Sequence, residues 1–123
     1  EINPIAHKYA FENVKKNKLE NKIRLFLGDV RKMMPKLNKR FNRILMPLPK
    51  GGENFLDLAL RYIKNKGIIH FYDFLYEDEF DLAVGKIKKA CDKLHKKYKI
   101  LKIVKCGQYS PRFYRVCVDF EAY

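Results

Sequence analysis

The chain has 123 residues, 47% of them hydrophobic and 33% charged, which predicts one folded domain with a modest core and excludes a disordered chain. Twenty-seven lysines and arginines against 14 acids give a net charge of +13. This charge indicates a polyanionic partner, with nucleic acid first and an anionic membrane surface second; a general preference for lysine is the alternative. No apolar run is long enough to span a membrane and no signal segment opens the chain, so we expect a cytoplasmic protein without membrane contact.

The first third predicts a helix, a strand and a short second helix. Asn3 fits an N-cap and Pro4 fits the first helical position, so the first helix is expected from there to about residue 17. Ile23–Leu27 predicts a short strand, closed by a turn that contains Asp29. Residues 31–40 then have room for only a turn or two of helix, broken at Pro35.

The middle of the chain alternates strands and helices. Residues 43–48 predict a strand, and a helix is expected from about residue 53 to residue 66 with Gly67 as its C-terminal cap. Residues 67–74 are mostly apolar, which is typical of a central strand.

The last part predicts the clearest helix, over residues 77–98, and then two strands. Apolar residues recur in this helix every three or four positions, with acids at its start and lysines at its end. Residues 99–110 and 113–123 predict strands joined by the short turn at Pro111, so this pair should be antiparallel. The order predicts an α/β fold with a mainly parallel sheet, an antiparallel C-terminal strand pair and no domain boundary.

Cysteines and histidines suggest no metal site, because no cysteine pair has metal-ligand or redox spacing and the histidines are scattered. Reduced packing cysteines suit a cytoplasmic protein. These residues are Cys91, Cys106 and Cys117, and His7, His70 and His95.

Carboxylates stand where strands of an open α/β sheet would end, and ligands bind outside those ends. Asp29 ends the first predicted strand, Asp73 ends the third, and Glu1 stands where a preceding strand would end. In a pair such as Glu1 and Asp29, one carboxylate can accept hydrogen bonds from a ribose diol, and the other can accept a hydrogen bond from an adenine amino group. The alternative for Asp29 is that it simply caps the helix behind it.

A rigid turn, Pro47-Leu48-Pro49, ends the second predicted strand. Proline fixes φ and has no N–H, so carbonyl oxygens in this turn are held in place without a competing local donor. Such oxygens can accept from the amino or imino group of a nucleobase. The alternative is a rigid loop that only starts the next helix.

Several stretches together resemble the archaeal tRNA guanosine-37 N1-methyltransferase family, which includes wyosine-pathway enzymes acting on the same nucleotide. They are EINPIAHKYAFENVKKNKLENKIRLFLGDVR, RILMPLPK, GIIHFYDF and YSPRFYRVCVDF, in this order over nearly the whole chain. The resemblance implies a Rossmann-like class I methyltransferase sheet, S-adenosylmethionine as cofactor, and the purine 3′ of a tRNA anticodon as substrate.

Site residues follow from the resemblance position by position. The cofactor-binding residues implied are Glu1, Asp29 and Val30. The catalytic motif implied is Pro47, Leu48 and Pro49. The residues implied on the tRNA side are Lys50, Tyr109, Ser110, Pro111 and Arg112. Stacking on the base is expected of Phe74, Tyr76 and Tyr109, with core packing the alternative for Phe74. Phosphate contacts are expected of Lys50, Lys105, Arg112 and Arg115, with a solvated surface charge the alternative for each.

The chain departs from the family in two ways. Pro47 stands where relatives that make N1-methylguanosine carry Asn, which resembles the branch that methylates 4-demethylwyosine. The family's glycine-rich cofactor loop, its first strands and its tRNA-docking domains come before the matched part. The chain is therefore expected to be the C-terminal part of a longer enzyme, monomeric when intact, or to have a partner chain. The competing functions are a wyosine-pathway aminocarboxypropyltransferase and a non-catalytic RNA-binding module.

Overall fold

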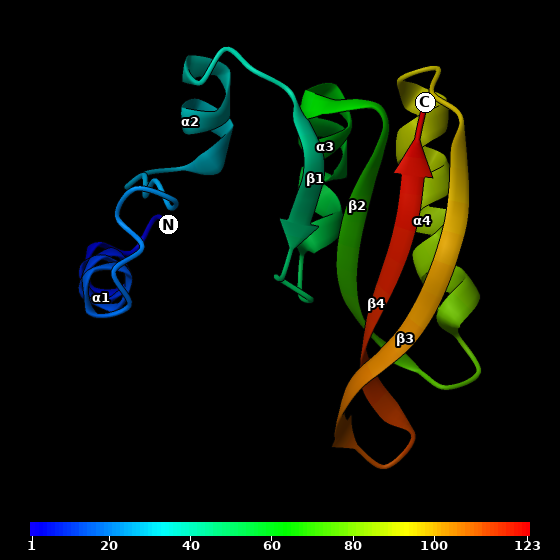
Figure 1. The fold of residues 1–123 in the computed structure, drawn as a ribbon. Coiled ribbons are helices and arrows are strands. Elements are labelled where there is room, and N and C mark those ends of the chain that lie inside the picture. The colour runs from blue at the N-terminus through cyan, green and yellow to red at the C-terminus, as the bar shows by residue number, and fades with distance from the viewer. The chain divides into compact units, whose positions relative to one another are not determined.

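The computed structural model describes all residues, Glu1–Tyr123, which form two compact units, Glu1–Asn38 and Lys39–Tyr123 (Figure 1). Neither unit contains a helix with the length and apolar character needed to cross a membrane. Each unit is described by itself below.

The first unit holds two helices, α1 (Pro4–Lys16) and α2 (Val30–Lys36). Helix α1 begins as the sequence predicts: Asn3 Oδ1 accepts hydrogen bonds from the backbone N–H groups of Ile5 at 2.9 Å and Ala6 at 3.3 Å. Helix α2 continues through Pro35 to Lys36, so the predicted break at Pro35 is wrong by one residue. Proline has no N–H to donate to the carbonyl four residues earlier, so the helix lacks one hydrogen bond there and ends one residue later.

The predicted strand Ile23–Leu27 does not form as a strand, and that prediction is wrong. Ile23 N at its start donates to Leu19 O at 2.9 Å, and the backbone of Glu1 pairs with its end. The Glu1 backbone nitrogen donates to Phe26 O at 3.0 Å, and Gly28 N donates to Glu1 O at 2.8 Å. These two bonds have the pattern of a single parallel bridge, and a ladder needs a partner several residues long.

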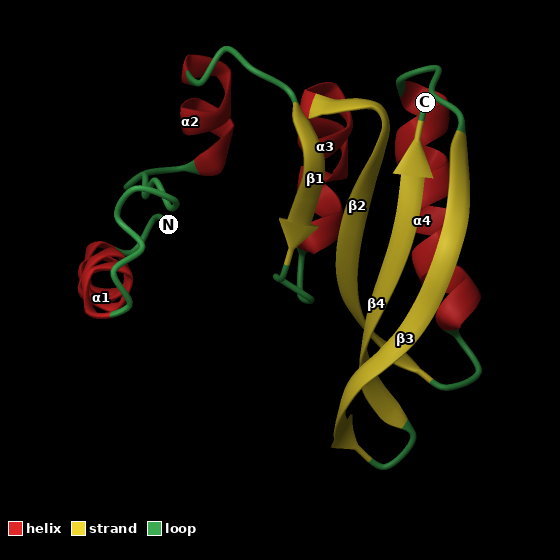
Figure 2. Ribbon diagram, viewed as in Figure 1, coloured by secondary structure: helices red, strands yellow, loops and turns green.

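The second unit is a four-stranded sheet in the order β1-β2-β4-β3, drawn in yellow in Figure 2. Its strands are β1 (Phe41–Met46), β2 (Ile63–Tyr76), β3 (Tyr98–Ser110) and β4 (Phe113–Ala122). β1 pairs with β2 in parallel, and β4 pairs antiparallel with both β2 and β3. β1, β2 and β3 therefore share one direction, and the antiparallel C-terminal pair is confirmed.

Helices cover one face of this sheet. They are the 3₁₀ helix η1 (Gly52–Phe55) and the α-helices α3 (Leu56–Tyr62) and α4 (Phe80–Lys93), and α3 and α4 lie behind the strands in Figure 1. The core lies between these helices and the sheet. Its largest fully buried side chains are Phe71, Phe120, Leu56, Leu60, Ile63, Ile69 and Ile87.

Two predicted helix ends are corrected. The helix expected to reach residue 66 stops at Tyr62, and Gly67 lies in β2 rather than at a helix cap. A Cβ on Gly67 would lie 2.6 Å from Ile63 Cγ1, so the chain folds too closely on itself there for any side chain. Helix α4 stops at Lys93, and Tyr98 opens β3 instead of extending the helical stripe.

The edges of the sheet are irregular. Met46, the last residue of β1, pairs with Phe71, whereas β2 runs on to Tyr76, which pairs with Phe113. β2, β4 and β3 therefore extend past β1 and form a step at its carboxyl end. At the opposite edge, the pairing of β3 with β4 shifts register three times along the strand, beginning between Ile100 and Lys102.

Candidate functional site

Two carboxylates of the first unit stand at one end of the same extended segment. The bridge between Glu1 and the segment ending at Gly28 brings Glu1 next to the turn that carries Asp29. Glu1 Oε1 accepts from Asn3 N at 2.8 Å, and this hydrogen bond lowers the pKa of Glu1. Asp29 Oδ1 accepts from Arg31 N at 2.8 Å. The backbone thus orients one oxygen of each carboxylate, which leaves the second oxygen of each for a ligand hydroxyl or amino group.

Capping, the alternative for Asp29, is confirmed, because Asp29 is the N-cap of α2. The two roles are compatible, since capping uses only one oxygen. Val30, the first residue of α2, follows Asp29 directly in the chain, and its apolar side chain is 43% exposed. A carboxylate next to an exposed apolar side chain suits a planar heterocycle with an amino group, so the cofactor role of these residues stays a prediction with a consistent geometry.

The Pro47-Leu48-Pro49 turn lies at the step where β1 ends in the second unit. Leu48 is 52% exposed, so the turn does not bury its central side chain. Behind the turn, a Cβ on Gly52 would lie 3.5 Å from Phe71 Cε2 and 3.6 Å from Tyr72 O. This close approach holds the segment after the turn against β2. The segment that follows the turn thus packs against β2, and Leu48 in the turn is exposed to solvent. Packing of this kind keeps the backbone of a binding turn in place.

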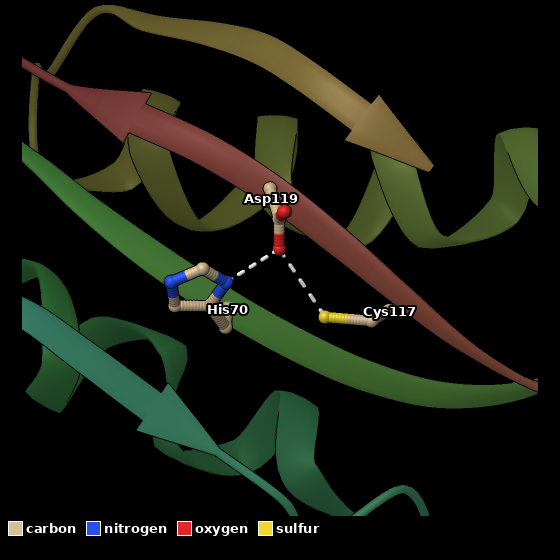
Figure 3. Close-up of side chains that lie close together, drawn as sticks. All are labelled: His70, Cys117 and Asp119. Carbon is tan, nitrogen blue, oxygen red and sulfur yellow. Dashed lines mark hydrogen bonds and ion pairs between the residues drawn. The ribbon is translucent and has the colours of Figure 1, made fainter. Parts of the chain in front are cut away.

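The sheet face opposite α3 and α4, here called the far face, carries a chain of polar side chains that the sequence analysis missed. Arg43 Nη1 lies 2.8 Å from His70 Nε2, and His70 Nδ1 lies 2.5 Å from Asp119 Oδ1. Cys117 Sγ donates to the same Asp119 oxygen at 3.3 Å (Figure 3). The residues come from β1, β2 and β4, so only the strand order and register could have revealed them.

His70, Cys117 and Asp119 offer three metal-ligating atoms within 4.8 Å of one another. Guanidinium groups only donate, so His70 Nε2 accepts from Arg43 and Nδ1 carries the proton donated to Asp119. Burial, with the neighbouring Asp119, raises the pKa of Cys117 to about 12, which keeps the thiol protonated. Both ring nitrogens and the thiol proton are thus engaged in a satisfied hydrogen-bond chain across three strands.

Four aromatic rings meet at the end of the far face that lies beyond β1. Phe74 and Tyr109 have ring centroids 5.1 Å apart, and Tyr76 and Phe113 have centroids 4.8 Å apart. Phe74 and Phe113 are stacked at 5.8 Å and join the two pairs. Beside them is a hollow of about 210 Å³, lined by Phe74, Gly107, Gln108, Tyr109 and Arg115. Because β1 and β3 run in one direction, this end of β3 lies at the same edge of the sheet as the Pro47-Leu48-Pro49 turn.

The residues predicted for the tRNA side differ in their surroundings. Tyr109 is 74% exposed, and Lys50 is exposed in the turn after β1. Ser110 ends β3, and Pro111 and Arg112 form the tight turn into β4. Arg112 Nε pairs with Glu77 Oε1 at 2.9 Å and its Nη2 lies 3.7 Å from Asp78 Oδ2, so this guanidinium already fastens the hairpin turn.

Asp73 does not lie at a strand end, which corrects its expected place. It lies within β2 on the helix-covered face, 4% exposed, and Lys86 of α4 donates to it at 2.5 Å. A second hollow, of about 390 Å³, lies between α3 and α4 on this face. Two of its three lysines are paired with acids, Lys86 with Asp73 and Glu53 and Lys93 with Asp57, so most of the positive charge of the lining is balanced.

Comparison with known proteins places this geometry in a family. The model of the TRM5/TYW2 methyltransferase domain matches residues 1–101. The tRNA (guanine(37)-N(1))-methyltransferase Trm5b of Methanocaldococcus jannaschii is 36% identical over 121 residues, which are 98% of this chain and 33% of that protein. The tRNA 4-demethylwyosine(37)-methyltransferase Taw21 of Saccharolobus solfataricus is 31% identical, over 99% of this chain and 44% of its own length. The tRNA(Phe) (4-demethylwyosine(37)-C(7)) aminocarboxypropyltransferase of M. jannaschii is 30% identical, over 97% and 47%.

Solved structures agree with these relatives. Trm5b from Pyrococcus abyssi superposes with a TM-score of 0.87 at 34% identity, over 99% of this chain and 36% of that one. M. jannaschii TYW2 in complex with AdoMet superposes with a TM-score of 0.82 at 28% identity, over 99% of this chain and 55% of that one. The structure of aTrm5 in complex with tRNALeu superposes with a TM-score of 0.82 at 36% identity, over 98% of this chain and 33% of that one. The chain spans between a third and a half of the length of the curated relatives it matches. The chain belongs to the TRM5/TYW2 methyltransferase family.

Proposed function

We infer that the protein acts in an S-adenosylmethionine-dependent tRNA methyltransferase that modifies the purine 3′ of the anticodon, at guanosine-37 N1, at 4-demethylwyosine C7, or at both. The observation that carries this proposal is the carboxylate pair Glu1 and Asp29, oriented at one end of a strand-like segment in a chain of this family. The +13 charge supports a nucleic-acid substrate, and a relative has been solved with tRNALeu. The cytoplasm, where tRNA is modified, is the location that this function implies.

Each part of the chain has its own task in this reaction. When bound, S-adenosylmethionine supplies an electrophilic methyl group that needs little activation. Glu1 would hold the ribose diol, Asp29 would accept from the adenine amino group, and Val30 would cover the ring. The Pro47-Leu48-Pro49 turn would hold the edge of the target base through fixed carbonyl oxygens. The protein thus contributes mainly proximity and orientation.

The position of Pro47 bears on the product. An amide side chain at this place could bond the guanine edge, whereas a proline side chain cannot. The three relatives described above, which carry out three related reactions, are 36%, 31% and 30% identical to this chain, so identity alone does not choose among them. We propose methyl transfer as the reaction and 4-demethylwyosine as a substrate, with aminocarboxypropyl transfer as the second candidate.

Cofactor binding is tested by calorimetry with S-adenosylmethionine on the full-length enzyme. Asp29→Asn keeps an N-cap oxygen and removes the charge, whereas Asp29→Ala removes both. We expect Asp29→Ala to weaken binding by about 1–3 kcal/mol, with Asp29→Asn intermediate. Wild-type protein that binds no S-adenosylmethionine would contradict the proposal and leave an RNA-binding module as the function.

The product is tested by mass analysis of tRNA after reaction, which separates a methyl from an aminocarboxypropyl group. Pro47→Asn is expected to shift preference towards plain guanosine. An unchanged ratio of rates on guanosine and 4-demethylwyosine tRNA would remove Pro47 from substrate selection.

A further inference from the structure

We propose that the hollow beside Phe74 and Tyr109 is a stacking subsite for one unpaired nucleobase of the RNA, separate from the base that is methylated. This proposal rests on the proposed function for the identity of the RNA. The hollow lies in the second unit, at the far-face end of the β3–β4 hairpin.

Exposure of the aromatic cluster is the first argument. Tyr109 is 74% exposed and Tyr76 is 48% exposed, although both contact other rings. Rings needed only for packing are covered by their neighbours, whereas these two present their surfaces to solvent. Aromatic faces in solvent are the platforms on which single-stranded nucleic acids stack, because every base has a π-face.

Size and shape are the second argument. The hollow of about 210 Å³ is smaller than the roughly 300–1,000 Å³ of ordinary small-molecule pockets, so it suits one planar ring system rather than a whole cofactor. Gly107 lines it without a side chain, and a Cβ there would lie 3.8 Å from Arg115 Nη2. The rings of Tyr109 and Phe74 line one side of the hollow, and the planes of the two rings are inclined by 56° to each other.

The polar lining is the third argument. Arg115 Nη2 donates to Cys106 O at 3.4 Å, which holds the guanidinium at the hollow, and the remaining N–H groups can reach the edge of a base. Gln108 Nε2 donates to Ser110 O at 3.2 Å, which orients its amide beside the same space. Arginine is the side chain that most often reads guanine, so a purine fits this lining.

Charge around the hollow points to a nucleic acid as occupant. Arg115 lines the hollow itself, and no acidic side chain lines it. Lys105 does not contribute here, because it lies on the helix-covered face against the rings of Phe80 and Tyr114 and pairs with Glu77. The chain as a whole carries +13. The hairpin end and the Pro47-Leu48-Pro49 turn share one edge of the sheet, so a nucleotide near the reacting one in the same loop is the occupant.

The test uses the full-length enzyme and an anticodon stem-loop RNA in which each loop position in turn carries 2-aminopurine. Stacking on Tyr109 should quench the fluorescence of one position other than the methylated one, and Tyr109→Ala should abolish that quenching. Tyr109→Ala should weaken RNA binding about 5- to 100-fold, whereas Tyr109→Phe should retain it. An RNA that lacks the base at that position should bind the wild-type enzyme with the same loss of affinity. For this abasic RNA, Tyr109→Ala should weaken binding no further.

The matched control is Tyr123→Ala, a partly exposed tyrosine at the opposite edge of the sheet, where neighbouring Ala122 pairs with Gly67. It should bind RNA as the wild type does. S-adenosylmethionine binding, measured by calorimetry, separates the two proposals: if the cofactor binds and Tyr109→Ala leaves RNA affinity and fluorescence unchanged, only the subsite is overturned. Equal losses in Tyr109→Ala and Tyr123→Ala would also overturn it.

Discussion

The two units of the chain differ in how they are stabilised. Lys39–Tyr123 contains every buried residue of the chain, whereas Glu1–Asn38 contains none. The first unit instead exposes several large apolar side chains: Ile2, Ile5, Tyr9, Phe11, Ile23, Leu27 and Val30. Its shape is set locally, by helix caps and by the backbone bridge of Glu1.

This difference divides the proposed work of the protein. The residues assigned to the cofactor lie in the unit without a core, and those assigned to the substrate lie in the unit with one. Carboxylates held only by local hydrogen bonds need further support to stay in place, because caps contribute about 1 kcal/mol each and a buried side chain contributes more. We therefore expect that loss of surrounding structure would lower the affinity for the cofactor more than it would lower the stability of the sheet.

The difference in stabilisation between the two units is tested most strongly by truncating one large aromatic side chain in each unit. Phe71→Ala removes a fully buried ring and should lower the free energy of unfolding by about 3–5 kcal/mol, through lost burial and the cavity left behind. Phe11→Ala removes a ring that is 58% exposed on α1 and should cost less than about 1 kcal/mol. Urea unfolding followed by circular dichroism measures both. Equal losses would show that the first unit has a core after all.

A second substitution examines the polar part of the core. Lys86→Met leaves the buried Asp73 carboxylate without its cation and should cost about 2–3 kcal/mol, below the usual range because Lys86 is partly exposed. Lys88→Met is the matched control on the same helix, since its partner Asp92 is solvent-exposed, and it should leave the unfolding midpoint almost unchanged. A large effect of both variants would indicate a general loss of helix charge balance instead.

Local signals predicted much of the fold. Asn3 and Pro4 mark the start of α1 by chemistry that acts within one turn, and the buried stripe of α4, with Ala83, Ile87 and Cys91, follows its period. The end of α3 escaped prediction because it depends on the close approach of Gly67 to Ile63, which only the tertiary fold creates.

The site was predictable to a smaller extent. The end of β1 just before Pro47 could be found from the order of predicted strands and helices, whereas the strand predicted before Asp29 does not form. The His70–Asp119 contact needs the register of two strands 49 residues apart, and the hollow at Tyr109 needs the antiparallel hairpin to bring Arg115 back beside Phe74. Neither register is encoded in a local pattern.

The first unit can be examined through its cap. Asn3→Ala removes the acceptor for two backbone N–H groups and should destabilise the start of α1 by about 1 kcal/mol. Hydrogen exchange of the Ile5 and Ala6 amides should accelerate, while amides of β2 keep their protection. Asn13→Ala, an exposed position within the same helix, should leave those two amides unaffected. Protection that survives Asn3→Ala would mean that α1 is stabilised by packing.

The expected effect that is smallest at neutral pH is a pH dependence of the second unit, which develops only in alkaline solution. Burial raises the pKa of Cys117 from 9.0 to about 12, so the folded state keeps a proton that the unfolded state loses. Stability from this group is complete below pH 9 and falls as the pH rises from about 9 towards 12. Cys117→Val should reduce that decline in thermal unfolding at alkaline pH without removing it, because burial also raises the pKa of Cys91, to about 11. An identical slope in Cys117→Val would assign the decline to other groups.

The broken register of β3 bears on how the protein behaves when it is concentrated. An outer strand with regular spacing would offer a second molecule an unbroken row of donors and acceptors to extend the sheet. Here the row is interrupted three times, and lysines such as Lys99 and Lys102 would meet their own copies across such a contact. Growth of sheets from molecule to molecule is thereby discouraged, and the charged, aromatic end of the β3–β4 hairpin stays exposed to solvent.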